Sequence, residues 1–331
     1  MSMENNLNKI FITGGAGYVG AVLVPRLLEE GYSVTVFDLM IYGEDVLQSH
    51  PNLTIIKGDI RDEHTLKDCI PGHDCVIHLA CISNDPSFEL NPELGKSINL
   101  DAFRPLVEIS QAASVKRFIY ASSSSVYGIK EEKDVYEEML LEPLTDYSKF
   151  KADCETILAE YQSPEFTTVT IRPATVCGYS PRQRLDVVVN ILSNLAFHKR
   201  EISVFGGDQL RPNIHIADMV DAYLALLKAP DEKIAGDVFN AGFENQTVLE
   251  LAETVQAVIG DDVNLVRTAS DDNRSYHISS KKIADKLGFK TTHTIKEAVE
   301  DLKTAFEKGL LPNSFEDERY FNIKRMQSLK L

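Results

Sequence analysis

The chain has 331 residues, a length that suits one large α/β unit or two lobes and excludes a peptide-sized module. Hydrophobic residues make up 44% and charged residues 25%, so a sizeable core is expected and disordered, collagen-like and membrane classes are excluded. The 34 lysines and arginines against 50 aspartates and glutamates give a net charge of −16. This charge repels nucleic-acid backbones and anionic lipid headgroups, so we expect neither as a partner.

The cysteine pattern and the first residues bear on the compartment. The five cysteines include no C-x-x-C pair and no secretory leader precedes them, so we expect neither a disulfide framework nor a zinc site. No cluster of His, Asp or Glu has metal spacing, and no apolar run approaches the ~18 residues of a membrane span. We therefore predict a cytoplasmic protein without a metal. Because buried cysteines are commonly inert, no catalytic role is expected for Cys81 or Cys177.

The first 38 residues predict a strand, a helix and a second strand. An apolar run at 9–12 ends in a glycine cluster, which is typical of a buried parallel strand. Residues 19–30 have apolar side chains at helical spacing, Gly31 ends this helix, and residues 33–37 form the next strand. This alternation continues with strands at 53–56, 75–78, 117–120 and 167–171 and helices at 62–69, 92–113 and 147–161.

The pattern changes after residue 172. Longer polar connections separate a strand at 237–240 from helices at 185–197, 218–228, 247–259, 280–286 and 295–308. Regular alternation followed by this change predicts an α/β fold: a Rossmann-type doubly wound parallel sheet over 1–172 and a smaller mixed α/β lobe over 173–331. The strand near 236–241 could return to the first sheet.

The connection from the first strand to the first helix has glycines at the spacing Gly14, Gly17 and Gly20. They allow a tight turn and a close backbone approach to a pyrophosphate at the helix N-terminus. Asp38 ends the second strand, where a carboxylate accepts a hydrogen bond from an adenosine ribose 2′-hydroxyl and repels a 2′-phosphate. Asp59 and Ile60 follow the third strand, where an adenine would lie. Each feature alone has an ordinary reading as a turn or cap; together they predict NAD rather than NADP.

A tyrosine and a lysine are four residues apart at the start of a predicted helix. Tyr147 and Lys151 therefore lie on one helical face. A lysine ammonium lowers the pKa of a nearby phenol and can hold a nicotinamide ribose, so Tyr147 is a candidate proton shuttle to a sugar hydroxyl. The serine run at 122–125 supplies a second hydroxyl. Such a Tyr–Lys pair also arises by chance on amphipathic helices, but the glycine loop and Asp38 make that reading less favourable.

Together these motifs resemble the extended short-chain dehydrogenase/reductase family, and within it the nucleoside-diphosphate-sugar epimerases and dehydratases, in particular UDP-glucose 4-epimerase-like proteins. The resemblance covers nearly the whole chain and extends to 78–80, Asn99, Arg172-Pro173 and 211–218. It implies an NAD-binding domain over 1–172 and a substrate-binding lobe with a C-terminal tail over 173–331. The implied cofactor residues, from the pyrophosphate through the adenosine to the nicotinamide, are Gly14, Gly17, Tyr18, Val19, Gly20, Asp38, Asp59, Ile60, Leu79, Ala80, Asn99, Tyr147 and Lys151.

The resemblance also implies the reacting and substrate-binding residues. Ser123 matches the catalytic Ser/Thr that acts with Tyr147 and Lys151. Arg211 and Arg274 match two arginines that grip the sugar-nucleotide diphosphate, a task that suits the guanidinium fork. Ser123 is also a candidate for substrate binding, as is Thr175, where many relatives have Asn. Ser83 and Asn84 are candidates only because they follow a predicted strand.

Two departures from the family pattern bear on the reaction. Dehydratases and decarboxylating relatives have an acid directly after the catalytic Ser/Thr, where this chain has Ser124. Relatives that epimerise next to a keto group have a cysteine where this chain has Ser125. We therefore predict an NAD-dependent epimerase acting at C4 through a transient 4-keto intermediate. The alternatives are a 4-dehydrogenase or 4-keto-sugar reductase with the same site and, from another class, a non-catalytic nucleotide-binding regulator.

We also expect a homodimer. The helices at 92–113 and 147–161 have more apolar residues than one sheet-facing stripe needs, and the resemblance implies that they pair across a two-fold axis. The alternative is that the segment 315–331 covers this apolar surplus within the protomer.

Overall fold

The computed structural model describes residues 7–83, 85–132, 134–269 and 277–331. Two of the predicted substrate residues, Asn84 and Arg274, lie outside these ranges. The described helices include none that is both long and apolar enough to cross a membrane.

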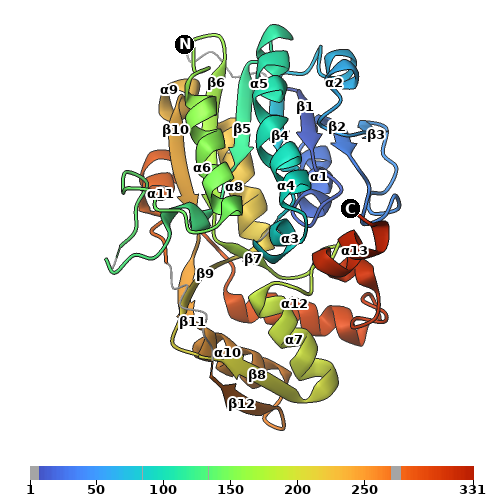
Figure 1. Cartoon of the computed structure of the whole chain (residues 1–331), viewed down its shortest axis with the longest axis vertical. Coiled ribbons are helices and arrows are strands. Elements are labelled where there is room, and N and C mark those ends of the chain that lie inside the picture. The colour runs from blue at the N-terminus through green and yellow to red at the C-terminus, as the bar shows by residue number, and fades with distance from the viewer. Residues whose placement is uncertain (1–6, 84, 133, 270–276) are drawn as a thin grey trace.

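A seven-stranded sheet forms the centre of the larger lobe (Figure 1). Its order is β10-β6-β5-β4-β1-β2-β3, and every neighbouring pair is parallel. The strands are β1 (Lys9–Thr13), β2 (Ser33–Asp38), β3 (Leu53–Lys57), β4 (Cys75–His78), β5 (Arg117–Ala121), β6 (Thr167–Pro173) and β10 (Asp237–Ala241). Ile12 of β1 is in register with Val36 of β2 and Ile77 of β4. The strand order reverses between β1 and β4, so the crevice expected in such a sheet lies at their carboxyl ends.

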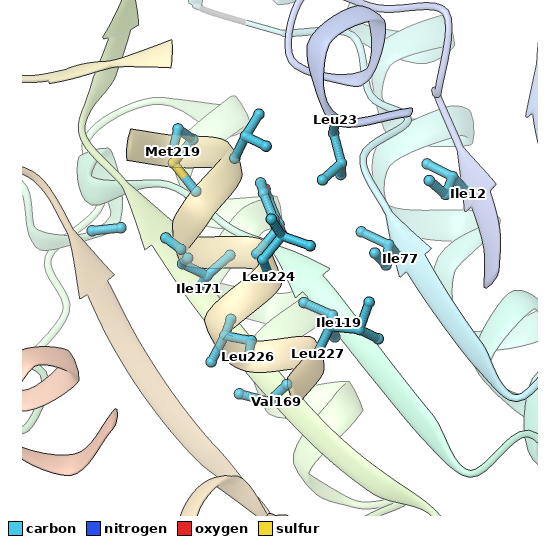
Figure 2. Close-up of a cluster of buried hydrophobic side chains, with 14 of the residues drawn as sticks. Ile12, Leu23, Ile77, Ile119, Val169, Ile171, Met219, Leu224, Leu226 and Leu227 are labelled. Carbon is cyan, nitrogen blue, oxygen red and sulfur yellow. The ribbon is translucent and has the colours of Figure 1, made fainter. Parts of the chain in front are cut away.

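Helices cover both faces of this sheet. One face is covered by α1 (Gly20–Glu29) and α8 (Ile216–Lys228), and the other by α2 (Glu63–Cys69), α5 (Phe103–Ala112) and α6 (Asp146–Ala159). Figure 2 shows side chains of α8, including Leu224 and Leu227, packed against Ile119 and Val169 of the strands. Nine of the thirteen residues of α8 are buried, so the helix is covered on more than its sheet-facing side.

The structure divides the segment 92–113, which we predicted as one helix, into three helical elements. These are α4 (Pro92–Lys96), a π-helical turn η1 (Ser97–Asp101) and α5. Inside the π turn, the Asn99 amide donates to the Ile82 carbonyl at 2.9 Å and its oxygen accepts from the Ile82 N–H at 2.8 Å. Such turns accommodate an inward polar side chain. A short helix, α3 (Asp85–Leu90), which the sequence analysis missed, precedes them.

The smaller lobe is mixed, as predicted. Its strands are β7 (Thr175–Cys177), β9 (Leu210–His215) and β11 (Glu244–Thr247) in one sheet and β8 (Glu201–Phe205) and β12 (Asn264–Thr268) in another. Its longer helices are α7 (Val188–Lys199), α10 (Val248–Ile259) and α12 (Ile295–Glu307), which enclose a separate core with β8. The short α9 (Asp231–Ile234) and α11 (Lys281–Leu287) flank β10 and β6. The predicted α/β class with a doubly wound parallel sheet is confirmed.

The chain crosses between the lobes more than once. After β9 it returns to the central sheet, where α8 covers one face and β10 pairs with β6. The predicted domain boundary near residue 172 stays a prediction.

The C-terminal segment also bridges the two lobes. It contains η3 (Glu318–Tyr320) and α13 (Asn322–Leu329), drawn in red in Figure 1. Tyr320 packs in a cluster with Leu185 and Phe306 of the smaller lobe, whereas Met326 is buried in a core of the larger lobe. Helix α13 packs against α3, and the Arg325 side chain donates to the Ile41 carbonyl.

Candidate active site

A cavity of about 350 Å³ lies at the carboxyl ends of β1 and β4, where the strand order reverses. Most of the predicted site residues line it: Gly14, Gly17, Tyr18, Val19, Gly20, Asp38, Ile60, Leu79, Ala80, Ser83, Ser123, Tyr147, Lys151 and Thr175. The structure therefore brings the glycine loop, the serine run and the start of α6 to one place.

The glycine loop is shaped by close backbone approaches. Gly14 has φ +74°, and a Cβ there would lie 2.6 Å from the Ala80 nitrogen. A Cβ at Gly20 would overlap the backbone of Gly15. Any larger residue at either position would push the loop away from the strands beneath it. The loop thus keeps the start of α1, whose first N–H groups have no carbonyl partners within the helix, at the cavity.

Asp38 ends β2 beside this loop. Its carboxylate accepts from the Ala16 N–H at 2.9 Å and from the Met40 N–H at 2.8 Å. Burial raises the pKa of Asp38, while these two N–H groups and the nearby Arg182 act to lower it. The carboxylate is therefore held in place beside the cavity by groups that favour its charged form.

Tyr147 and Lys151 enter the cavity from the first turns of α6. Thr145 caps this helix: its hydroxyl accepts from the Ser148 N–H at 3.3 Å and donates to Asp85 Oδ1 at 2.6 Å. The Lys151 ammonium donates to the Ala121 carbonyl at 2.6 Å and lies 5.9 Å from the centre of the Tyr147 ring. The helix cap and this contact fix both side chains at the end of β5.

The Tyr147 phenol is in a low-dielectric setting. Burial raises its pKa, and Cys81 and Asp85 raise it further. A hydrogen bond with Ser123 and the positive charge of Arg184 act in the opposite direction. The net pKa is raised, so the lowering that we expected from Lys151 is wrong, and Ser123 and Arg184 offset only part of the rise. The Ser123 hydroxyl also lies 2.8 Å from the Ser125 hydroxyl.

A buried polar network supports the serine run and α6 from below. Arg172 of β6 donates from Nη2 to Glu155 Oε2 at 2.6 Å and from Nη1 to the Tyr127 hydroxyl at 2.7 Å. The Ser122 hydroxyl donates to the same Glu155 carboxylate. The ion pair is almost fully buried, so its charges are compensated by each other and by these hydroxyls.

Two arginines in the cavity wall were missed by the sequence analysis. Arg182 and Arg184 reach it from the segment between β7 and α7. Arg184 donates from Nε to Asp186 Oδ1 at 2.8 Å and from Nη1 to the Ser83 hydroxyl at 3.3 Å. Burial lowers the pKa of Arg182 to about 10, so this side chain remains a cation at neutral pH. The only sequence signal was two arginines in a short loop after a predicted strand.

Some predicted site residues do not line the cavity. Asp59 pairs with Arg61, with 2.9 Å between Oδ1 and Nε, and Asn99 braces Ile82, which does line it. Arg211 lies on β9, where Nη1 donates to the Leu210 carbonyl at 2.9 Å. The ligand roles assigned to these three residues stay predictions, as do those of Asn84 and Arg274.

The histidines and cysteines have structural surroundings. His78 Nδ1 lies 2.6 Å from the Thr13 hydroxyl, and burial lowers the pKa of His78 to about 3. His215 caps α8, accepting from the Ala217 N–H at 3.1 Å. Cys177 is buried and Cys81 lines the cavity. Within the described ranges, no group of three or more His, Cys, Asp or Glu residues is arranged to hold a metal ion.

Comparison with known proteins gives the family. The sequence profile of the NAD-dependent epimerase/dehydratase family matches residues 10–242. A UDP-glucose 4-epimerase of Lactobacillus helveticus is 27% identical over 333 residues, covering 94% of this chain and 100% of that protein. A dTDP-glucose 4,6-dehydratase of Streptomyces niveus is 27% identical over 304 residues, covering 85% of this chain and 87% of the relative. The uncharacterised protein y4nG of Sinorhizobium fredii is 35% identical over 216 residues, and this chain spans only 52% of its length.

A solved structure agrees with these relatives. The crystal structure of UDP-glucose 4-epimerase from Thermotoga maritima with UDP-glucose has a TM-score of 0.81 and 25% identity, covering 91% of this chain and 99% of that one. The profile match spans most of the chain, including the glycine loop, the serine run and Tyr147. The chain is therefore a member of the NAD-dependent epimerase/dehydratase family, an enzyme that uses NAD, as the resemblance in its sequence predicts.

Proposed function

We propose that the protein is a nucleoside-diphosphate-sugar epimerase that inverts C4 through a transient 4-keto sugar. The observation that carries the proposal is that Ser123, Tyr147 and Lys151 all line the cavity, with Tyr147 and Lys151 on the same face of α6. Ser124 and Ser125, which follow Ser123, also line the cavity, and neither can act as the acid that elimination of water requires.

The residues around the cavity fit a dinucleotide. The glycine loop lies in the cavity wall, where its backbone can approach a pyrophosphate, and the buried Arg182 adds a positive charge. NAD, when bound, supplies reversible hydride transfer.

Within this proposal the chain's own groups handle the proton. Tyr147 accepts the proton of the C4 hydroxyl and later returns it, while Ser123 donates a hydrogen bond that stabilises the phenolate. Arg184 favours the same phenolate by its charge. Lys151, held by the Ala121 carbonyl, keeps its ammonium beside the ring and can reach a ribose hydroxyl of the cofactor.

We also propose that Arg211 and Arg274 bind the diphosphate of the sugar nucleotide from the smaller lobe. Arg211→Ala should weaken UDP-sugar binding by about tenfold or more and NADH binding by less than about threefold, because charge-assisted bonds to phosphate are lost. Calorimetry with both ligands measures this. Equal losses for the two ligands would place Arg211 outside the diphosphate site.

A panel of UDP- and dTDP-sugars tests the reaction. The purified protein is incubated with each sugar, products are identified by NMR, and the NADH absorbance band is followed. A C4 epimer without net NADH supports the proposal. Stoichiometric NADH identifies a dehydrogenase, NADH-dependent reduction of a 4-keto sugar identifies a reductase, and loss of water identifies a dehydratase. No reaction across the panel would favour a nucleotide-binding regulator.

We further propose a cytoplasmic homodimer formed by the helices at 92–113 and 147–161. Among their apolar residues, Ile98, Leu106, Ile109 and Leu158 are buried within the protomer, whereas Phe150 and Ile157 are only partly buried. The apolar surface left for a partner is therefore smaller than the sequence predicts. Light scattering of the full chain tests the dimer, and a monomer at micromolar concentration rejects it.

A further inference from the structure

Arg182 is a buried cation with unused hydrogen-bond donors. Only 4% of the residue is exposed, and its Nε and Nη1 have no hydrogen-bond partner among the described residues. Its neighbour Arg184 is paired with Asp186, so that carboxylate is already engaged. A buried guanidinium without a paired anion is costly, because its lost hydration is not replaced. The cavity wall therefore has a charge that an anionic ligand can compensate.

The surroundings of Arg182 place it at the cofactor half of the cavity. Its guanidinium stacks on the Tyr42 ring, with 3.5 Å between the central carbon and the ring centroid. It also acts electrostatically on Asp38 and on Tyr18 of the glycine loop. Stacking covers one face of the guanidinium and leaves the N–H groups of Nε and Nη1, which lie in its plane, free to donate. Arg184, by contrast, contacts Ser83 and influences Tyr147, at the reacting end.

Asn322 at the start of α13 holds this arginine. The Arg182 Nη2 donates to Asn322 Oδ1 at 2.7 Å, and the Asn322 amide donates to the Ser83 hydroxyl at 2.9 Å. The Asn322 N–H donates to Asp186 Oδ2 at 2.9 Å. One buried asparagine thus joins the segment after β4, the segment before α7 and the C-terminal segment at the cavity.

We propose that Arg182 binds a phosphate of the NAD pyrophosphate from the smaller lobe, opposite the glycine loop, and that Asn322 positions it. The pyrophosphate is then held between the glycine loop of the larger lobe and Arg182 of the smaller lobe. Helix α13 holds Arg182 in place through Asn322. This proposal concerns cofactor binding and is independent of whether the enzyme is an epimerase.

Binding measurements on the full-length, cofactor-stripped protein test the proposal. Arg182→Gln should raise the NADH Kd by about tenfold or more, since a charge-assisted bond to phosphate is lost, and should raise the ADP Kd similarly. The Kd for adenosine, which has no phosphate, and for UDP should each change by less than about threefold. Arg200→Gln is the matched control, because Arg200 pairs with Asp262 at the surface and should leave all four affinities unchanged.

Three results would overturn the proposal: an NADH Kd within about threefold of the parent, an equal loss for ADP and adenosine, or a loss for UDP alone. The last would assign Arg182 to the sugar nucleotide. Asn322→Ala tests the positioning role and should weaken NADH and ADP by a smaller factor than Arg182→Gln, again sparing adenosine. If Arg182→Gln does not fold, Arg182→Lys keeps the charge but loses the planar fork. It should then show intermediate NADH binding, and parent-like NADH binding by both Arg182→Lys and Asn322→Ala would reject the proposal.

Discussion

The two walls of the cavity are built in different ways. The wall of the larger lobe is formed by the turn at 13–20, by strand ends that lie next to one another in the sheet and by the start of α6. The opposite wall is made by side chains, above all Arg182 and Arg184, whose positions depend on partners such as Asn322, 140 residues away from Arg182. The first wall is therefore set by local sequence, whereas the second exists only when distant segments have come together.

The largest expected effect concerns the chemistry at the first wall. Tyr147→Phe should lower turnover by about 1,000-fold, because it removes the proton-transfer hydroxyl and keeps the ring. NADH and UDP affinities should stay within about threefold of the parent, since both walls keep their shape. Steady-state kinetics on the sugar that the panel identifies, with calorimetry for binding, measure both effects. Turnover within about tenfold of the parent would remove Tyr147 from the mechanism.

The steric basis of the first wall can be broken with a single methyl group. Gly20→Ala should lower the free energy of unfolding by about 2–4 kcal/mol, because the new Cβ overlaps the Gly15 backbone. Gly72→Ala is the control: φ is +84° there and nothing lies within 4 Å of the added atom, so only about 1 kcal/mol of backbone strain is expected. Denaturant unfolding measures both. Equal losses would show that the loop tolerates the methyl.

The preference for NAD over NADP tests the first wall, because we expect it to depend on Asp38. This carboxylate lies near Arg182 of the second wall. Asp38→Asn keeps the shape of the side chain and removes its charge, so the ratio of NADPH to NADH affinity should rise by about tenfold. Fluorescence titration with both cofactors measures the ratio, and an unchanged ratio would mean that Asp38 does not face the 2′ position.

The smallest effect lies away from the cavity, where the residue before the Thr294 cap of α12 contacts α8. His293 Nδ1 is 2.9 Å from the buried Asp218 carboxylate, and this hydrogen bond raises the pKa of His293. Because the folded pKa lies above the unfolded one, the pair stabilises the protein fully below about pH 6.5, and that contribution is lost as pH rises through the folded pKa. The melting-temperature difference between the parent and His293→Gln should therefore shrink from pH 5.5 to pH 8. The half-exposed ring makes the effect small, and a constant difference would contradict it.

The same difference between the walls explains which elements and site residues could be predicted from the sequence. The elements up to residue 171 were predicted closely because long apolar runs and glycines report on local structure. The exceptions were α3, which was missed, and 92–113, where the inward turn of Asn99 interrupts an otherwise regular pattern. The strands β7, β8, β9, β11 and β12 were missed: β7 has only three residues, and β11 and β12 have no fully buried residue. Arg182 was missed because its environment is supplied by residues far away in sequence, which no periodicity reports.

One stripe along α6 links catalysis to folding. Tyr147, Lys151 and Glu155 follow one another at intervals of four residues: the first lies at the reacting end of the cavity, the second contacts the end of β5, and the third is paired with Arg172 of β6. Inserting one residue between Lys151 and Glu155 would rotate the preceding turn by about 100° and draw the phenol out of the cavity or the carboxylate away from its partner. Length changes in this helix should therefore be excluded during divergence. New substrates would then arise through the loops and the smaller lobe, with α6 kept in register.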